Sequence, residues 1–269
     1  MKLPTFIVDV FTDEAFKGNA AGVCLLSIEL SDSLMQNIAA ELNLSETAFL
    51  LKDQEKDNIF HIRYFTPTTE IPFCGHATFG SACLLLQNYR LKSVELITST
   101  GLHLTGRNED NVTIMQFPVY DPVTVPVNEK LLNALGISEQ IAYKFSHEIS
   151  MLLIEIEDVE KLMVLAPDFT ALLQSASDIQ EVVVTAKSKD NQYDFYSRCF
   201  CPWIGINEDP VTGAAHCLLA PHWQRVLQKN TFKAFQCSKR GGYLNLKIES
   251  DTLLVSSTAS IILEGMMNL

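Results

Sequence analysis

The alternation of apolar and polar residues predicts that most of this chain forms β-strands. Phe60, Ile62 and Tyr64 alternate with His61 and Arg63, and this period of two is typical of a strand with one buried face. Similar short runs between turn residues predict many more strands. They cover residues 5–10, 20–26, 46–52, 94–98, 102–107, 111–116, 141–145, 150–156, 181–186 and 193–200, with further strands from 232 onward.

Two predicted helices stand out because they are apolar on most sides. They begin near Gly75 and Gly213, each after a loop that contains proline, and each leads into small and apolar residues. A helix of this kind has to be surrounded by other elements, so we expect a sheet wrapped around each one. The prolines of 118–126 divide the chain into two similar halves, 1–118 and 119–269, and the last residues, about ten, are able to pack on the first half. Other helices are predicted to open at Ser31, to cover 128–135, and to lie as short pieces within 158–175.

Composition, charge and cysteine content narrow the class of protein. The chain has 269 residues, a net charge of −12 and no apolar stretch long enough to span a membrane, so we expect no nucleic-acid or membrane partner. Seven scattered cysteines and an N-terminus without a signal peptide predict a cytoplasmic protein. There is no nucleotide-binding glycine motif and no metal-ligand spacing, so neither a cofactor nor a metal is predicted.

The helix starts at Gly75 and Gly213 are candidate anion sites. The first turn of a helix has N–H groups without helical partners and lies at the positive end of the helix dipole. Two such starts facing one cleft would bind a small anion, typically a carboxylate. The competing interpretation is that both starts are purely structural, as most helix starts are.

Three other residues near these starts are candidates for chemistry. Glu46 enters an apolar strand, where partial burial suits a carboxyl group to general acid/base work, although an exposed strand-end glutamate is the structural alternative. Cys74 and His76 flank the first helix start, but positions two apart on a helix do not face each other, so no Cys–His dyad is predicted. Asp209 is expected in the first place to cap the second helix, and in the second place to hold a substrate or orient His76.

Three motifs contain these candidates, and a fourth lies near the N-terminus. They are Gly18-Asn19-Ala20, Asn43-Leu44-Ser45-Glu46-Thr47-Ala48-Phe49, Cys74-Gly75-His76-Ala77-Thr78 and Glu208-Asp209-Pro210-Val211-Thr212-Gly213. Together and in this order they resemble the PhzF-like family of phenazine-biosynthesis isomerases, and the resemblance covers nearly the whole chain. Two further segments, Asp194-Phe195-Tyr196-Ser197-Arg198 and Phe235-Gln236-Cys237-Ser238-Lys239-Arg240-Gly241-Gly242, look especially like the animal MAWD-binding branch of that family. The family usually has proline where Ala20 stands and often serine where Ala214 stands, so the substrate is left open.

The resemblance implies a diaminopimelate-epimerase-like α+β fold with two pseudo-symmetric halves. Each half is a mostly antiparallel sheet or barrel around a central helix, and the site lies between them. The resemblance also implies cofactor-independent isomerisation of a small carboxylic acid, with Glu46 as the acid/base and with His76 and Asp209 shaping the site. The residues implied in substrate binding are Asn19, Cys74, Gly75, Ala77, Thr212, Gly213, Ala214 and Ala215. A homodimer is compatible with the resemblance.

Two other functions are kept open by the same residues. The chain could be a binding or scaffold protein built on an isomerase fold, since fold does not determine function. It could also be a racemase or epimerase that uses Cys74 as a base. Asp209 stands near the place where such enzymes have their second thiol, so a two-cysteine mechanism does not carry over.

Overall fold

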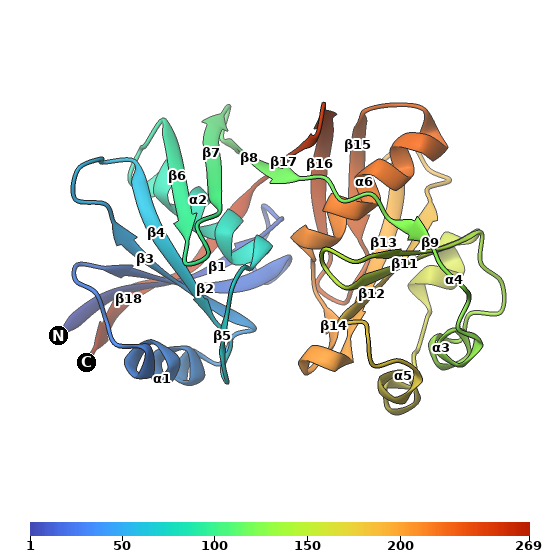
Figure 1. Cartoon of the computed structure of the whole chain (residues 1–269). Coiled ribbons are helices and arrows are strands. Elements are labelled where there is room, and N and C mark those ends of the chain that lie inside the picture. Colours follow the sequence, from blue (N-terminus) through green and yellow to red (C-terminus); the bar gives the residue numbers. More distant parts are fainter. The chain divides into compact units, whose positions relative to one another are not determined.

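The computed structural model describes all 269 residues, which form two units (Figure 1). Unit 1 comprises Met1–Phe117 and Leu254–Leu269, and unit 2 comprises Pro118–Leu253. The C-terminal stretch belongs to unit 1 because β18 (Ala259–Asn268) pairs antiparallel with β1 (Lys2–Val10) along its whole length. The two ends of the chain therefore lie side by side.

In unit 1 a mixed sheet is built outward from β1. The strands that follow are β2 (Asn19–Leu26), β3 (Glu46–Lys52), β4 (Ile59–Phe65), β6 (Ser93–Thr98), β7 (His103–Glu109) and β8 (Val112–Pro118). Neighbours pair antiparallel except β2–β3 and β4–β6, which are parallel. The short β5 (Glu70–Ile71) adds to β4, and β17 (Thr252–Ser257) pairs with β8. The parallel pairs require crossover connections, and the helices of unit 1 lie in these connections.

Helix α2 (Gly75–Asn88) is the centre of unit 1. Every side chain from Gly75 to Leu86 is buried, and the helix contacts β1, β2, β3, β6 and β7. This is the sheet-wrapped helix expected from a surface that is apolar on most sides. The amphipathic α1 (Asp32–Leu42) instead packs only one face on the sheet, and its N-cap Ser31 accepts a hydrogen bond from the Leu34 N–H.

Unit 2 repeats the same topology. Its sheet runs β9 (Val123–Thr124), β10 (Ala142–Ser146), β11 (Met151–Ile156), β12 (Glu181–Lys187), β13 (Phe195–Cys201), β15 (Thr231–Gln236) and β16 (Gly242–Glu249). Only β11–β12 and β13–β15 are parallel, and β14 (Ile206–Asp209) adds to β13 as β5 adds to β4. The segment between β13 and α6 contains η1 (Pro202–Ile204) as well as β14. The remaining short helices are α3 (Glu129–Leu135), α4 (Val159–Met163) and α5 (Phe169–Ser175).

Helix α6 (Gly213–Leu227) is the counterpart of α2 and continues through a proline. Pro221 has no N–H, so the carbonyl oxygen of Cys217 loses its helical partner. The N–H of Tyr120 donates to that oxygen at 3.0 Å, which ties the segment entering unit 2 to the helix. Trp223 stacks on Phe195 with ring centroids 5.3 Å apart and anchors the far half of α6. No helix of the chain is both long and apolar enough to cross a membrane.

Candidate active site

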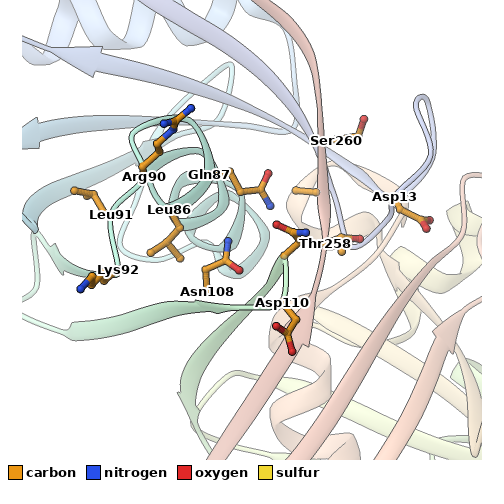
Figure 2. A pocket seen from close by; sticks show the side chains of 12 residues that line it. Asp13, Leu86, Gln87, Arg90, Leu91, Lys92, Asn108, Asp110, Thr258 and Ser260 are labelled. Carbon is orange, nitrogen blue, oxygen red and sulfur yellow. The ribbon is translucent and has the colours of Figure 1, made fainter.

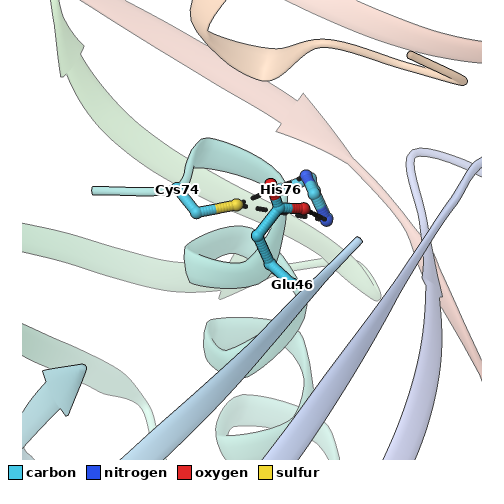
Figure 3. A group of neighbouring side chains, drawn as sticks. All are labelled: Glu46, Cys74 and His76. Carbon is cyan, nitrogen blue, oxygen red and sulfur yellow. Dashed lines mark hydrogen bonds and ion pairs between the residues drawn. The ribbon is translucent and has the colours of Figure 1, made fainter. Parts of the chain in front are cut away.

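Strand β3 and the N-terminus of α2 bring three predicted side chains together in unit 1. Glu46 is the first residue of β3, Cys74 is the N-cap of α2, and His76 lies in the first turn of that helix. The Nε2 atom of His76 lies 3.3 Å from Oε2 of Glu46, and its Nδ1 atom lies 3.4 Å from Sγ of Cys74. Figure 3 shows the three side chains directed toward one another. The imidazole therefore contacts both a carboxylate and a thiol.

The Glu46 side chain is mostly buried, and one of its carboxylate oxygens has no hydrogen-bond partner. Its side chain is 12% exposed, and the Oε2 atom is buried and accepts no hydrogen bond. The His76 ring lies near that oxygen without the alignment of a hydrogen bond. A buried carboxylate oxygen is stabilised by a proton, a hydrogen-bond donor or a cation. This atom is therefore suited to accept a proton or a hydrogen bond from a bound molecule.

Asn19 supports the imidazole from the neighbouring strand. It is the first residue of β2, which runs parallel to β3, and its Nδ2 atom lies 3.3 Å from Nδ1 of His76. When this amide donates to Nδ1, the ring proton resides on Nε2 and faces Glu46. Gly18 has a φ of 61°, and a Cβ at this position would lie 2.0 Å from a main-chain oxygen. Glycine is therefore required in the turn that positions Asn19.

The contact between Cys74 and His76 contradicts the expectation that these residues do not face each other. Helical spacing applies only where both residues have helical backbone angles. Cys74 is the N-cap and is extended, with φ −142° and ψ 116°, and its thiol does not cap the helix. Its side chain is therefore available to the ring two residues later, and the prediction from helical spacing was wrong.

The first turns of α2 and α6 contain the other predicted binding residues. Gly75 and Ala77 lie in the first turn of α2, and Gly213, Ala214 and Ala215 lie in that of α6. In neither helix does an N-cap side chain accept a hydrogen bond from the first turn. Both starts thus lack the usual capping oxygen, which is the condition under which backbone N–H groups bind an anion.

Asp209, at the end of β14, is tied to the start of α6 in unit 2. Its Oδ2 atom accepts a hydrogen bond of 2.5 Å from the Thr212 hydroxyl, and its main-chain oxygen accepts one from the Gln236 amide. Gln236 in turn accepts a hydrogen bond from the Thr212 N–H. The N-cap of α6 is Thr212, so the prediction that Asp209 caps this helix was wrong. Asp209 orients the cap residue instead.

The sequence analysis missed Cys199, which lies opposite Asp209 in the pairing of β13 with β14, and its partner Glu181. The Cys199 thiol donates to Oε2 of Glu181 at 3.3 Å. Burial, followed by the nearby Glu181 and Asp209 charges, raises the pKa of Cys199 well above its usual range. Glu181 is the first residue of β12, the position that Glu46 has in β3. The repeat of elements in the two halves is the signal that would have found it.

The predicted site residues are divided between the two units. Asn19, Glu46, Cys74, Gly75, His76 and Ala77 belong to unit 1, and Asp209, Thr212, Gly213, Ala214 and Ala215 belong to unit 2. Within unit 1 the structure brings two of the three predicted catalytic residues, Glu46 and His76, to within 3.3 Å of each other. The joint action of residues from both units on one substrate stays a prediction.

An open hollow of about 1030 Å³ lies at the other end of α2 and contains none of the predicted residues (Figure 2). Leu86 and Gln87 of α2 line it, together with Arg90 and Lys92. Acidic Asp13 also lines it, so the hollow has no single sign of charge. The candidate active site is therefore the group at the N-terminal end of α2.

Comparison with known proteins identifies relatives along the whole chain. Residues 8–265 match the PhzC-PhzF family, whose description is phenazine biosynthesis-like protein. An uncharacterised isomerase of Halalkalibacterium halodurans is 42% identical, over 98% of this chain and 98% of its own length. Phenazine biosynthesis-like domain-containing protein 2 of Mus musculus is 39% identical, over 98% of this chain and 99% of its own.

Solved structures confirm the predicted α+β class. A PhzF-family protein from Enterococcus faecalis matches with a TM-score of 0.92 and 35% identity, covering 100% of both chains. A probable proline racemase from Agrobacterium radiobacter matches with a TM-score of 0.61 over 99% of this chain and 92% of its own, at 10% identity, which is a likeness of fold alone. The resemblance found in the motifs is thereby confirmed, and the chain belongs to the PhzC-PhzF family of phenazine biosynthesis-like proteins.

Proposed function

We propose that this protein is a cofactor-independent isomerase that moves a proton on a small carboxylic acid, with Glu46 as the group that carries the proton. The observation that carries the proposal is the buried Oε2 atom of Glu46, which accepts no hydrogen bond and lies beside His76. The name of the Halalkalibacterium relative, an isomerase, supports the reaction class. Family membership supports the choice of this glutamate.

The proposed reaction needs only proton transfer. The Glu46 carboxylate takes a proton from a carbon of the substrate, so a C–H bond breaks and an O–H bond forms. The electron pair left on that carbon is delocalised into the adjacent unsaturated group. Glu46 then returns the proton to a different carbon and is a carboxylate again. Nothing is oxidised or reduced, and no co-reactant is consumed.

The surrounding groups have distinct tasks in this proposal. His76, 3.3 Å from the Glu46 carboxylate, holds the side chain in place and donates to it when the proton has left. The first-turn N–H groups near Gly75 bind the substrate carboxylate, which would fix the reacting carbon. Asp209 and the first turn of α6 are proposed as further contacts to the substrate.

Deuterium exchange tests the proposal without knowledge of the natural substrate. Small amino, hydroxy and unsaturated carboxylic acids are incubated with the protein in deuterated water, and mass spectrometry measures incorporation at carbon. We expect Glu46→Gln to slow exchange by about 10²–10⁴-fold, because the amide keeps the shape and loses the base. Glu41→Gln, on the exposed face of α1, is the matched control and should exchange at the wild-type rate. Unchanged exchange by Glu46→Gln would refute the assignment.

The contact of Cys74 with His76 favours one second candidate, a thiol-dependent racemase. The sulfur lies 3.4 Å from Nδ1, a distance at which the ring can accept the thiol proton. In that case Cys74→Ser abolishes exchange at the α-carbon and Glu46→Gln does not. If neither the wild type nor any variant exchanges deuterium into any of these acids, a binding or scaffold function takes the place of both candidates.

A further inference from the structure

We propose that Glu46, Cys74 and His76 form a binding site for a thiophilic divalent cation, Zn²⁺ in the first place, and that the bound ion switches the site off. The three side chains offer ligand atoms that all lie within 4.8 Å of one another. The binding half of the proposal stands on this geometry alone. The inhibitory half rests on the proposed function of Glu46.

The ligand set matches the chemistry of zinc. Thiolate, imidazole and carboxylate are the three ligand types that Zn²⁺ takes from proteins, and open zinc sites have three protein ligands with the fourth position left to water or substrate. A thiolate ligand selects Zn²⁺ over Mg²⁺ and Ca²⁺, which prefer oxygen. The motif spacing conceals this set, because Glu46 comes from a different element than Cys74 and His76.

The distances are close to those of a tetrahedral centre. Zinc–ligand bonds of about 2.0–2.3 Å in tetrahedral geometry place neighbouring ligand atoms about 3.3–3.6 Å apart. The Nε2 atom of His76 lies 3.3 Å from Oε2 of Glu46, within that range. The Sγ atom of Cys74 lies 4.0 Å from the same Nε2 atom, so a small rotation of the thiol completes the geometry.

The charges of the ligands and the contact between Asn19 and His76 also suit the ion. A thiolate and a carboxylate together cancel the double positive charge, which a nearly buried site requires. The thiol proton is released to solvent when the ion binds. Asn19 lies 3.3 Å from Nδ1 of His76, and rotation of its amide presents an oxygen that accepts the Nδ1 proton, as partners of metal-bound histidines do.

Binding of the ion and catalysis exclude each other. The ion would occupy Oε2 of Glu46, the oxygen that accepts no hydrogen bond and that the proposed reaction uses as its base. A coordinated carboxylate is no longer a base for a C–H proton. Zinc would therefore act as a reversible inhibitor that competes with the carboxylic acid substrate.

Titration of the purified full-length protein with Co²⁺ and then Zn²⁺ tests the binding half without any substrate. We expect one equivalent of Co²⁺ to produce a thiolate-to-cobalt charge-transfer band, which Zn²⁺ removes by competition. Loss of a residue that only hydrogen-bonds to a metal ligand weakens metal binding by about 10–100-fold. Loss of the ligand itself in Cys74→Ser should therefore weaken Zn²⁺ binding at least about 100-fold. Cys237→Ser, which removes the partly exposed cysteine, is the matched control and should bind like the wild type.

X-ray absorption of the zinc-loaded wild type gives a readout that does not depend on a variant that folds. We expect one sulfur neighbour at about 2.3 Å and nitrogen or oxygen neighbours at about 2.0–2.2 Å. The proposed site would be overturned if the wild type gave no charge-transfer band, or if the band persisted in Cys74→Ser. It would also be overturned if X-ray absorption found no sulfur, or more than one, bound to the zinc. If zinc binds as expected while deuterium exchange is absent for every acid, the proposed function fails and the metal site stands.

Discussion

His216 should make the stability of unit 2 depend on pH in a way that one substitution removes. The residue lies fully buried in the first turn of α6. Its Nδ1 atom lies 2.8 Å from the carbonyl oxygen of Thr212, to which it donates, and its Nε2 atom has no hydrogen-bond partner. Burial lowers the pKa of His216 from 6.5 to about 4, because a second ring proton would be buried without an acceptor.

The sign and size of the effect follow from linkage. Between pH 6.5 and pH 4 the unfolded chain binds a proton at this position and the folded chain does not, so the free energy of unfolding falls as the pH is lowered. With the two pKa values the loss is about 2 kcal/mol at pH 5 and about 3 kcal/mol below pH 4. Above pH 7 His216 no longer makes the free energy of unfolding depend on pH, because it is unprotonated in both states.

Urea unfolding at pH 8 and pH 5 measures this loss. Both tryptophans, Trp203 and Trp223, belong to unit 2, so their fluorescence reports on the unit that contains His216. His216→Gln cannot be protonated and carries only a packing cost, which the measurement at pH 8 isolates. On going to pH 5 the wild type should lose about 2 kcal/mol more than the variant. An equal loss in the two proteins would refute the reasoning, because all other titrating groups are common to both.

Two further pairs of substitutions test local arguments by urea unfolding. Gly18→Ala should lower the free energy of unfolding by about 3 kcal/mol, since φ is 61° and the added Cβ would meet a main-chain oxygen. Gly101→Ala, with φ 81° and no atom within 4 Å of the added Cβ, should lower it by about 1 kcal/mol. Equal losses in the two variants would contradict the clash at Gly18. Arg198→Lys should cost about 2 kcal/mol, because lysine cannot keep both bonds, of 2.7 and 2.9 Å, to the half-buried Glu208. Arg107→Lys, in an exposed ion pair, should cost less than about 1 kcal/mol, and a similar loss at both arginines would show that the paired geometry is unimportant.

Part of the candidate active site was predictable from the sequence because it is local. Cys74, Gly75 and His76 are adjacent in the chain, and the apolar run after them predicts a buried helix whose start is α2. The contact between the thiol and the ring was not predictable in the same way. It depends on the extended backbone of the N-cap, which the helical pattern does not reveal.

Contacts between segments far apart in the chain could not be predicted from the alternation of apolar and polar residues. Glu46 was a candidate on its own motif, but its distance of 3.3 Å from His76 exists only because β3 runs beside the start of α2. Glu181 and Cys199 have no motif, and the pairing of β12 with β13 brings them together beside Asp209. Side chains from separate elements meet when strands pair, and period-two alternation does not say which strands pair.

By itself the sequence predicted the elements and their burial: alternating strands and two helices apolar on most sides. The division at the prolines of 118–126 was likewise a prediction from the sequence. Only the tertiary structure decided that β18 returns to pair with β1 and that two pairs in each sheet are parallel. The physical reason is that local periodicity reports which face of an element is buried, whereas pairing depends on contacts far apart in the chain, whose free energy no single segment contains.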